Sequence, residues 1–228
     1  MMPQTPSDEY SNPAALSGGQ ALAYLRDHPW VLGNELERLL LIPLAALRWR
    51  LAGVQIGAGW RCYGLPIVQR QRQSRIEIGA RCNLRSTARS NPLGPAHPVI
   101  LSTRRAGAAL RIGADFGMTG GSIVCEERIE IGARVFVGAN CVISDTDFHP
   151  LDPVLRQLAP QAGATAPVII GDDVFIGMQT LVLKGVRIGA GSVIGAGSVV
   201  TRDIPPGVIA AGSPARVLRP LAGAVDRA

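Results

Sequence analysis

An aliphatic residue recurs at every sixth position near the end of the chain, and this period limits the possible folds more than any other feature. The run consists of Ile170, Ile176, Val182, Ile188, Ile194 and Val200. A period of six matches neither the 3.6-residue repeat of a helix nor the two-residue alternation of a strand. It predicts a solenoid in which three six-residue units, each a short strand and a corner, complete one triangular turn.

The same phase occurs earlier in the chain, at Ile131, Val137 and Ile143. We expect each in-phase aliphatic side chain to point inward and to stack on its equivalent one turn away. The glycines that follow many of them stand where a Cβ would crowd the corner. The pattern predicts a β-solenoid over 54–219, an N-terminal tail with helices over 1–53, and a C-terminal tail over 220–228.

Two segments interrupt the period, and we expect both to be inserted loops. They cover 83–109 and 144–167. Ile143 and Ile170 are 27 residues apart, which we interpret as one 18-residue turn with about nine extra residues bulging from it. Long loops on a regular scaffold often carry function, so the second segment is the first place to look for a site.

Composition narrows the classes of function. Of 228 residues, 47% are apolar and 18% charged, which excludes a disordered chain, and the formal net charge is +6. Only ten residues are aromatic, too few to predict a stacking platform for nucleic acid. The four cysteines form no CxxC pair and the three histidines are not at coil spacing, so we expect neither disulfides nor a metal site.

The N-terminal region predicts an amphipathic helix with leucines at helical intervals. They are Leu36, Leu40, Leu44, Leu47 and Leu51. The helix ends in Arg48-Trp49-Arg50, which is typical of a membrane-interface edge. Two interpretations stay open: the helix caps the open end of the solenoid, or Leu36–Trp49 contacts a membrane or a lipid-linked substrate. No signal pattern and no apolar run of spanning length occurs, so we expect a cytoplasmic protein, peripheral on the inner face of the membrane if the helix docks.

The second interruption contains two acidic residues and a histidine close together, in Asp145-Thr146-Asp147-Phe148-His149-Pro150. A neutral imidazole accepts a proton from a hydroxyl or an amine, so His149 is the candidate general base. Asp145, Asp147 or a backbone carbonyl would hold its other ring nitrogen and fix the tautomer. The sequence does not choose among these three, and aspartates are also common turn formers.

The segment 168–219, with VIIGDDVFIG and VLKGVRIGAGSVIGAGSVV, resembles the hexapeptide-repeat acyltransferases. Within that family it is similar to the galactoside and maltose O-acetyltransferases and to exopolysaccharide acetyltransferases of the colanic acid type. The resemblance implies an all-β fold, a left-handed parallel β-helix with an N-terminal helical extension. It also implies a homotrimer with acetyl-CoA bound as acyl donor in the groove between subunits.

The resemblance also implies roles for individual residues. His149 stands where the family has its catalytic histidine. The positions that match contacts to the acyl donor are Met178, Ala196, Thr201, Arg202, Arg216 and Arg219. The planar guanidinium of arginine suits the phosphates of such a donor.

We therefore expect an O-acetyltransferase acting on a sugar hydroxyl, in the synthesis of a surface polysaccharide or glycolipid. No GxSxG nucleophile motif is present, so direct attack by the activated acceptor is favoured over a covalent acyl-enzyme. The alternatives are an N-acyltransferase on an amino sugar and a non-catalytic scaffold of a polysaccharide assembly complex. A zinc enzyme of the γ-carbonic-anhydrase kind is disfavoured, since it needs three histidine ligands.

Overall fold

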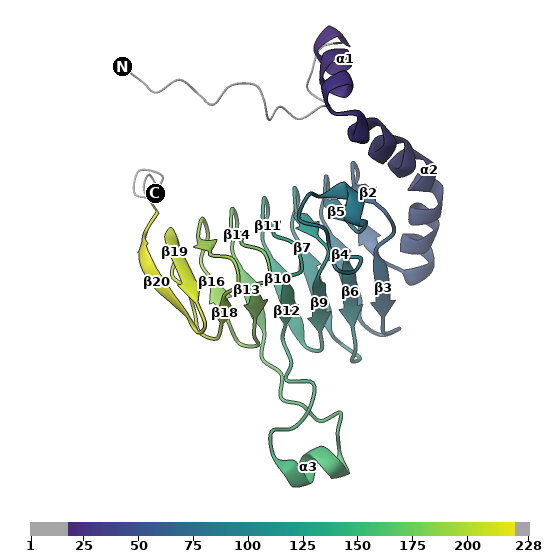
Figure 1. Ribbon diagram of the computed structural model, residues 1–228. Helices are drawn as coiled ribbons and strands as arrows, with labels where there is room; N and C mark the ends of the chain where they lie inside the picture. Colours follow the sequence, from purple (N-terminus) through teal and green to yellow (C-terminus); the bar gives the residue numbers. More distant parts are fainter. Residues whose placement is uncertain (1–17, 222–228) are drawn as a thin grey trace.

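The computed structural model describes residues 18–221. The tail expected at the start of the chain therefore lies outside the described residues, as does 222–228 of the expected C-terminal tail. Two helices, α1 (Gly18–Asp27) and α2 (Pro29–Ala52), precede a stack of short strands. Figure 1 shows the strands stacked along one axis, with both helices at the N-terminal end of the stack.

The strands form three sheets, which we name A, B and C. Sheet A contains β1 (Gln55–Ile56), β4 (Arg75–Ile78), β7 (Ala109–Ile112), β10 (Arg128–Ile131), β13 (Val168–Ile170) and β16 (Arg187–Ile188). Sheet B contains β2 (Arg61–Tyr63), β5 (Asn83–Arg85), β8 (Gly117–Thr119), β11 (Phe136–Val137), β14 (Phe175–Ile176), β17 (Val193–Ile194), β19 (Val208–Gly212) and β20 (Ala215–Pro220). Sheet C contains β3 (Ile67–Arg70), β6 (Ile100–Thr103), β9 (Ser122–Cys125), β12 (Val142–Ser144), β15 (Leu181–Val182) and β18 (Val199–Val200).

The chain visits sheets A, B and C in turn, which makes the fold the expected left-handed parallel β-helix. Residues eighteen apart are paired in register, as in Ile170 with Ile188 and Ile176 with Ile194. The six in-phase aliphatic residues are all at most 2% exposed. The prediction that they stack inside the solenoid is confirmed. Full burial of one such side chain contributes roughly 1.5–3 kcal/mol, so the stack is the main source of stability.

The small residue after each in-phase aliphatic allows successive coils to approach closely. A Cβ added to Gly177 would lie 2.5 Å from the backbone nitrogen of Ala196 in the next coil. That distance is far below van der Waals contact, so only glycine fits here. The prediction that a Cβ would crowd this corner is confirmed.

Helix α2 packs its buried side against the first coil. Ala45 and Trp49 are 2% and 3% exposed, and Trp49 belongs to the main hydrophobic core. The helix continues through Pro43 and ends at Gly53, whose φ of 65° places it in the left-handed region that favours glycine at a helix end. The expectation that Trp49 forms part of an interfacial edge is wrong, because its ring faces the protein.

The first interruption is shorter than the sequence predicted. Strands β5 and β6 fall within 83–109, and both pair in register with the strands of neighbouring coils. The chain leaves the coil mainly over 86–99, where a short 3-10 turn, η3 (Ala88–Ser90), faces α2. The sequence did not predict these two strands because the residues around them are polar and rich in proline. Their inward residues, Leu84 and Leu101, are buried.

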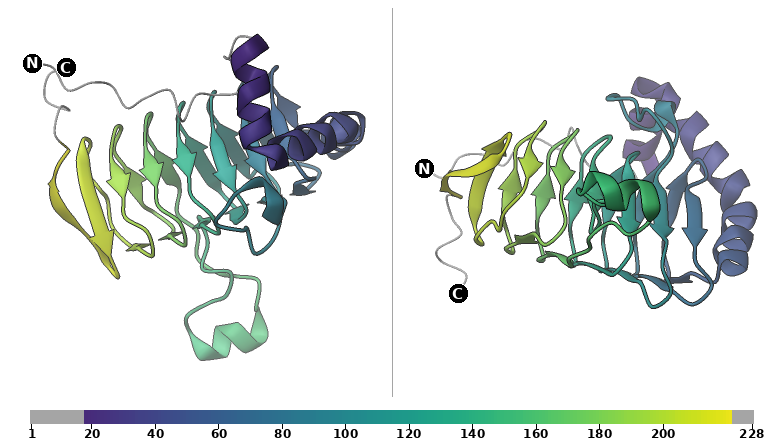
Figure 2. Two further views of the ribbon diagram at one scale, coloured as in Figure 1. Left: turned by 45° about the horizontal axis from the view of Figure 1, so that its top comes forward. Right: turned by 90° about the horizontal axis from the view of Figure 1, so that it is seen from below.

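The second interruption forms a long projection that we call the arm, residues 145–167. It leaves the solenoid between β12 of sheet C and β13 of sheet A, and it carries α3 (Pro153–Leu158) at its tip (Figures 1 and 2). A regular step from sheet C to sheet A takes six residues, whereas Ile143 and Ile170 are 27 apart, so about 21 residues are inserted at one corner. The expected bulge of nine residues is wrong because the insertion replaces no full turn.

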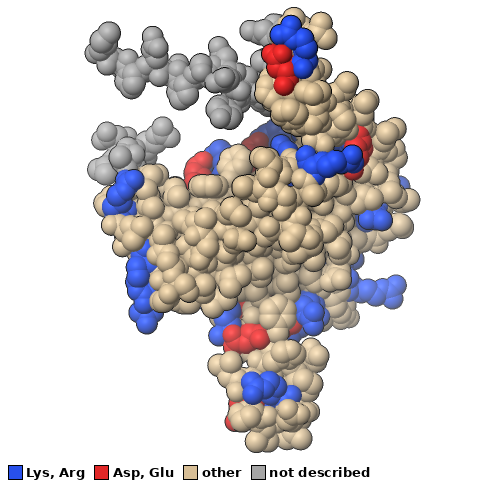
Figure 3. All heavy atoms as spheres, in the orientation of Figure 1, with Lys and Arg blue, Asp and Glu red and all other residues tan. Residues whose placement is uncertain are grey.

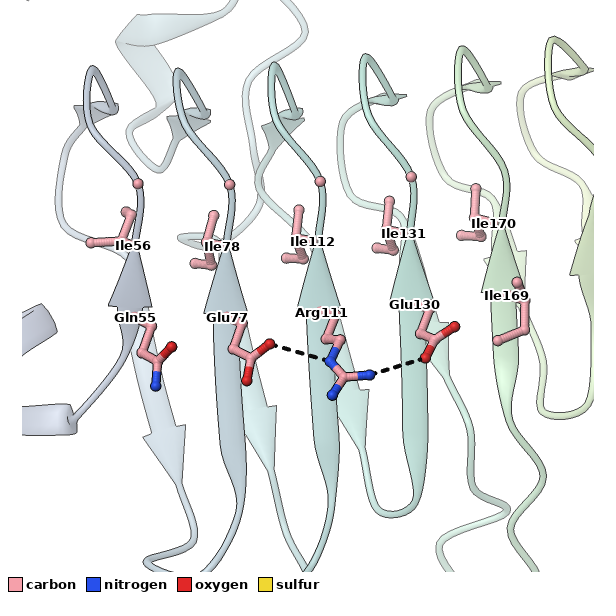
Figure 4. A pocket seen from close by; sticks show the side chains of 14 residues that line it. Gln55, Ile56, Glu77, Ile78, Arg111, Ile112, Glu130, Ile131, Ile169 and Ile170 are labelled. Atoms are coloured by element: carbon pink, nitrogen blue, oxygen red, sulfur yellow. Dashed lines mark hydrogen bonds and ion pairs between the residues drawn. The ribbon is translucent and has the colours of Figure 1, made fainter.

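The outward faces of the three sheets differ in chemistry. Figure 4 shows the face of sheet A, where Arg111 pairs with Glu77 and Glu130 on the adjacent strands at 3.2 and 3.5 Å. Sheet B instead exposes Phe136 and Phe175, which are paired in register and are 59% and 48% exposed. Sheet C carries Val142, Leu181 and Val199 in one outward row. The face seen in Figure 3 accordingly shows a broad area over the coils without charged side chains.

Candidate active site

The base of the arm is a narrow two-stranded segment that holds the DTDFHP residues in place. Thr146 and Thr165 form an antiparallel bridge, and the Asp147 N–H donates to the Ala164 carbonyl at 3.0 Å. Phe148 has a φ of 64°, a left-handed conformation that is unusual for an aromatic residue. Gly163 lies against it, and a Cβ there would be 2.6 Å from the Phe148 carbonyl carbon.

Two arginines and a buried glutamate fasten the arm to the solenoid. Arg105 donates to the carbonyls of Gln161 and Gly163 at 2.9 and 3.1 Å. It also forms an ion pair with Glu126 at 2.8 Å, and Glu126 accepts a hydrogen bond from the Thr146 hydroxyl. Arg104 forms a second ion pair with Glu126 at 3.2 Å. The Glu126 side chain is only 5% exposed, so these contacts are partly shielded from water.

The His149 side chain is exposed, and one of its ring nitrogens is fixed. Nδ1 lies 2.6 Å from the carbonyl oxygen of Pro160, which is in the turn after α3. A carbonyl can only accept, so Nδ1 carries the hydrogen and Nε2 of the neutral ring is left with a lone pair. Of the three candidates for fixing the tautomer, the structure therefore shows the backbone carbonyl.

The Asp145 carboxylate bonds the solenoid rather than the His149 ring. The side chain is 0% exposed and accepts from the backbone N–H groups of Glu126, Glu127 and Arg128 at 2.7–2.8 Å. The Cys125 thiol also donates to it at 3.4 Å. Of the three alternatives for holding the His149 ring, Asp145 is therefore not the one that the structure shows, since a charge so deep inside is stable only when its oxygens are bonded.

The Asp147 carboxylate forms an ion pair with Lys184 at 3.2 Å. Lys184 follows β15, one coil beyond the arm, and both side chains are partly buried. The pair ties the arm to the next coil. Asp147 touches the histidine only through its backbone, because its carbonyl accepts the His149 N–H at 2.7 Å.

The predicted donor-contacting residues divide into three places. Met178 and Ala196 lie at the corner between sheets B and C, on successive coils. Thr201 and Arg202 lie at the opposite edge of sheet C, in the same column of corners as Lys184 and the arm. Arg216 and Arg219 are exposed on β20, the last strand of sheet B. One chain therefore brings Thr201 and Arg202 to the side of the arm but does not gather all six residues.

Several residues that shape this site gave no signal as functional residues. Pro160 and Gly163 act through backbone geometry, and Glu126 is buried among aliphatic strands. Lys184 is the exception, because it is the single lysine among 23 basic residues. Its uniqueness was a usable signal for a role other than surface charge.

No group of three histidine, cysteine or acidic side chains within 18–221 is arranged to hold a metal ion. The four cysteines are all free and buried. Burial raises the pKa of Cys82 and Cys141 to about 11, so neither thiol is a nucleophile near neutral pH.

Comparison with known proteins identifies the six-residue repeat and relatives that contain it. A family model described as the bacterial transferase hexapeptide (six repeats) matches residues 167–202, and one described as the hexapeptide repeat of succinyl-transferase matches 128–144. The galactoside O-acetyltransferase of Escherichia coli is 43% identical over 106 residues, which is 46% of this chain and 49% of that protein. The enzyme of the same name from Lactococcus lactis is 44% identical over 106 residues, covering 46% and 48%. The chain thus spans about half the length of the curated relatives it matches.

A solved structure resembles the whole solenoid. A variant of AntD, an N-acyltransferase from Bacillus cereus in complex with dTDP-4-amino-4,6-dideoxyglucose and coenzyme A, aligns with a TM-score of 0.58. The alignment covers 77% of this chain and 89% of that one at 17% identity, so it shows a shared fold alone. The six-residue period, the three parallel sheets and the matched repeats on both sides of the arm together show that the chain contains the hexapeptide repeat of bacterial transferases, and about half of it is similar to galactoside O-acetyltransferases.

Proposed function

We propose that the protein is an acetyl-CoA-dependent O-acetyltransferase that acetylates a sugar hydroxyl, with His149 as the general base. The fixed tautomer of His149 carries this proposal. Its Nδ1 is held by the Pro160 carbonyl, and its Nε2 is available on an exposed side chain. The names of the Escherichia coli and Lactococcus lactis relatives support acetyl transfer to oxygen.

In the proposed reaction Nε2 of His149 takes the proton of the acceptor hydroxyl as its oxygen attacks the thioester carbonyl. The new C–O bond forms, a tetrahedral oxyanion develops, and a backbone N–H donates to it. The C–S bond then breaks and the imidazolium returns the proton to the departing thiolate. The hydrogen bond to Pro160 supports both steps, because it stabilises the protonated ring without taking its proton.

The donor's phosphates would lie against the exposed guanidinium groups of Arg202, Arg216 and Arg219. All three are exposed and form no ion pair with an acidic side chain in the described part of the chain. Free arginine forks suit phosphate oxygens.

Substitution of His149 by alanine tests the base. Turnover of acetyl transfer should fall by about 10²–10⁴, while affinity for acetyl-CoA and the melting temperature stay unchanged. His97→Ala is the matched control, because His97 also bonds a proline carbonyl through Nδ1 but lies in the loop over 86–99. Product formation must be measured with the acceptor present, since water can cleave the thioester without the base. Near-normal turnover of His149→Ala would remove the residue from the mechanism.

The same geometry permits an amine acceptor, so N-acylation of an amino sugar is the second candidate. Parallel assays with hydroxyl and amino sugars, read by the mass and alkali lability of the product, separate the two. A non-catalytic scaffold would release no coenzyme A thiol with any acceptor. The proposal also places the protein in the cytoplasm and in surface polysaccharide or glycolipid synthesis.

We further propose a homotrimer that buries the outward faces of sheets B and C. Sheet A is covered by a ladder of ion pairs, whereas Phe136, Phe175 and Leu181 leave large apolar areas exposed on the other two sheets. The predicted donor-contacting residues lie at both edges of sheet C and on β20 of sheet B, so two neighbouring chains would be needed to gather them. Light scattering should show a trimer for the native protein, and a smaller species for Phe136→Asp. A native monomer at micromolar concentration would contradict this assembly.

The outer side of α2 is proposed to contact an anionic membrane surface. Leu36, Leu40, Leu47 and Leu51 are 50–80% exposed and share the side of the helix opposite the buried Trp49. The helix's own acidic residues, Glu35 and Glu37, instead face the protein, where Arg38 and Arg89 pair with them. None of the helices within 18–221 is both long and apolar enough to cross a bilayer.

Flotation with phosphatidylcholine vesicles that contain phosphatidylglycerol tests this contact. Leu40→Asp should abolish flotation, because it places a charge at the centre of the apolar side. Leu158→Asp is the matched control, since Leu158 is 77% exposed on the arm against 80% for Leu40. Flotation of the native protein should weaken with salt. Failure of the native protein to float at low salt would favour a helix that only caps the solenoid.

A further inference from the structure

A cavity lies on the opposite side of the solenoid from the arm. We call it the helix pocket; it is enclosed by α1, α2, the outward residues of β2 and β5, and the segment around η3. Its volume is about 1150 Å³, somewhat above the usual range of roughly 300–1,000 Å³ for small-molecule sites. It includes none of the residues assigned to acetyl transfer. Figures 1 and 2 show the helices and the arm projecting from different parts of the molecule.

The charged residues of the helix pocket are mostly basic. Four arginines line it, and Glu35 is its one acidic lining residue. Hydrogen bonds from Tyr63 and Arg38 hold the pKa of Glu35 below its ordinary value, although burial alone would raise it. Glu35 is therefore ionised, and it compensates Arg38. Arg89 pairs with Glu37 at 2.6 Å.

Two arginines on the floor of the helix pocket form no ion pair or hydrogen bond with an acidic side chain among the described residues, although the charge of Arg61 also helps to lower the pKa of Glu35. Arg85 donates to the Ser90 carbonyl and lies over the Tyr63 ring at 4.7 Å. Arg61 makes no side-chain hydrogen bond or ion pair within 18–221, and it is only partly exposed. A guanidinium has five N–H donors, so both groups can bind an anion without losing an existing partner.

An acceptor atom beside Arg61 is also unpaired. Oδ1 of Asn83 is buried and has no hydrogen-bond partner, and Asn83 is paired in register with Arg61 across β2 and β5. A buried unsatisfied oxygen costs about 1–3 kcal/mol, so a bound donor would be stabilising here. A ligand that satisfies both groups must carry an anionic oxygen and, close to it, a hydroxyl or N–H.

The wall opposite this floor is aromatic. The Tyr24 and His28 rings stack at 4.2 Å, and Trp30 meets His28 edge-on at 5.3 Å. Trp30 is 61% exposed, so its face is free for a planar or apolar group. We propose that the helix pocket binds a sugar linked to a phosphate or diphosphate, with the phosphate on Arg61 and Arg85 and a sugar hydroxyl on Asn83. The carrier beyond the phosphate, a nucleoside or a lipid, would lie against the aromatic wall.

Calorimetric titration without acetyl-CoA tests this site independently of acetyl transfer. The probes are inorganic pyrophosphate, glucose 1-phosphate, UDP-glucose and a short polyprenyl diphosphate-linked sugar in detergent. At least one sugar phosphate should bind more tightly than pyrophosphate, because only it reaches Asn83. Tighter binding of UDP-glucose indicates a nucleoside carrier, and tighter binding of the polyprenyl compound indicates a lipid carrier. Failure of all four probes to bind would overturn the proposal.

Two variants locate the binding. Arg61→Gln should weaken the best probe by about 10–100-fold, the loss expected for a charge-assisted hydrogen bond. Asn83→Asp should weaken binding of the best probe at least as much. Aspartate has the size of asparagine, so the coil should stay folded, but its negative charge would repel the phosphate and pair with Arg61. The control is Arg81→Ala, since Arg81 lies in the coil of β5 but pairs with Asp115 outside the helix pocket. Native affinity in both variants, with melting temperatures intact, would place the ligand elsewhere.

Discussion

Removal of the Asp145 carboxylate should unfold the coil that supports the arm, and this is the sharpest energetic prediction of the structure. Asp145→Ala deletes the acceptor for three backbone N–H groups, those of Glu126, Glu127 and Arg128. The site is closed to solvent, since the Asp145 side chain is 0% exposed. Water therefore cannot replace the lost oxygens without opening the corner.

The loss of stability in Asp145→Ala follows from the number of hydrogen bonds that the carboxylate accepts. A hydrogen bond to a charged group contributes about 1.5–3 kcal/mol, and unpaired buried donors keep their desolvation penalty. Shared acceptors and local relaxation reduce the sum, so we expect a loss of about 3–5 kcal/mol in the free energy of unfolding. For a domain of this size that is a fall of about 10 °C in the melting temperature. Asp145→Asn keeps one acceptor oxygen and should lose less than Asp145→Ala.

Calorimetry and amide hydrogen exchange measure this effect together. The amides of residues 126–128 should be protected in the native protein and exchange fast in Asp145→Ala. Asp152→Ala is the matched control in the same arm, because Asp152 caps α3 by accepting from the exposed Leu155 N–H at 2.8 Å. It should cost about 1 kcal/mol, confined to α3. If Asp145→Ala melted with the native protein but lost activity, the carboxylate would act in the chemistry and our structural interpretation would be refuted.

Three further results are expected. Gly138→Ala should destabilise the protein by about 1–3 kcal/mol in denaturant unfolding, since the new Cβ would lie 2.5 Å from the Met178 backbone nitrogen, whereas Gly33→Ala, with open space around it, should not. Arg216→Ala should raise the KM for acetyl-CoA by about 5–150-fold with little change in kcat if the guanidinium holds a donor phosphate, and an unchanged KM would show a plain surface charge. Iodoacetamide at pH 8 should leave Cys82 and Cys141 unmodified until urea unfolds the protein, because burial raises the pKa of both thiols to about 11.

The sequence predicted the solenoid well because its period records inward positions directly. Ile170, Ile176 and Val182 are buried for one repeated reason, so a regular pattern reveals them. Side chains that act once are harder to place. Trp49 lies between two exposed arginines, and only the packing of α2 on the first coil shows that its ring is buried.

The candidate site was predictable as a location but not as a geometry. The broken period and the single DTDFHP motif pointed to His149 in the arm. The partner of its Nδ1 is a backbone carbonyl eleven residues later. Because every residue has a carbonyl, the sequence does not indicate which one makes this contact. Asp145 and Asp147 looked equivalent beside it, yet one serves the backbone of the coil and the other pairs with Lys184.

The corner between sheets C and A explains why the solenoid can tolerate an insertion of this length next to the proposed general base. In a regular corner the backbone of the next coil accepts the N–H groups, as the Val186 carbonyl does for the Ile169 N–H. Where the arm leaves, that backbone is missing, and the Asp145 carboxylate supplies the acceptors instead. Asp203 does the same for the Arg187 N–H at the last such corner, with a single bond of 2.8 Å. The coil is thus closed by the first residue of the arm, whereas the His149 ring is held farther along the arm by the Pro160 carbonyl.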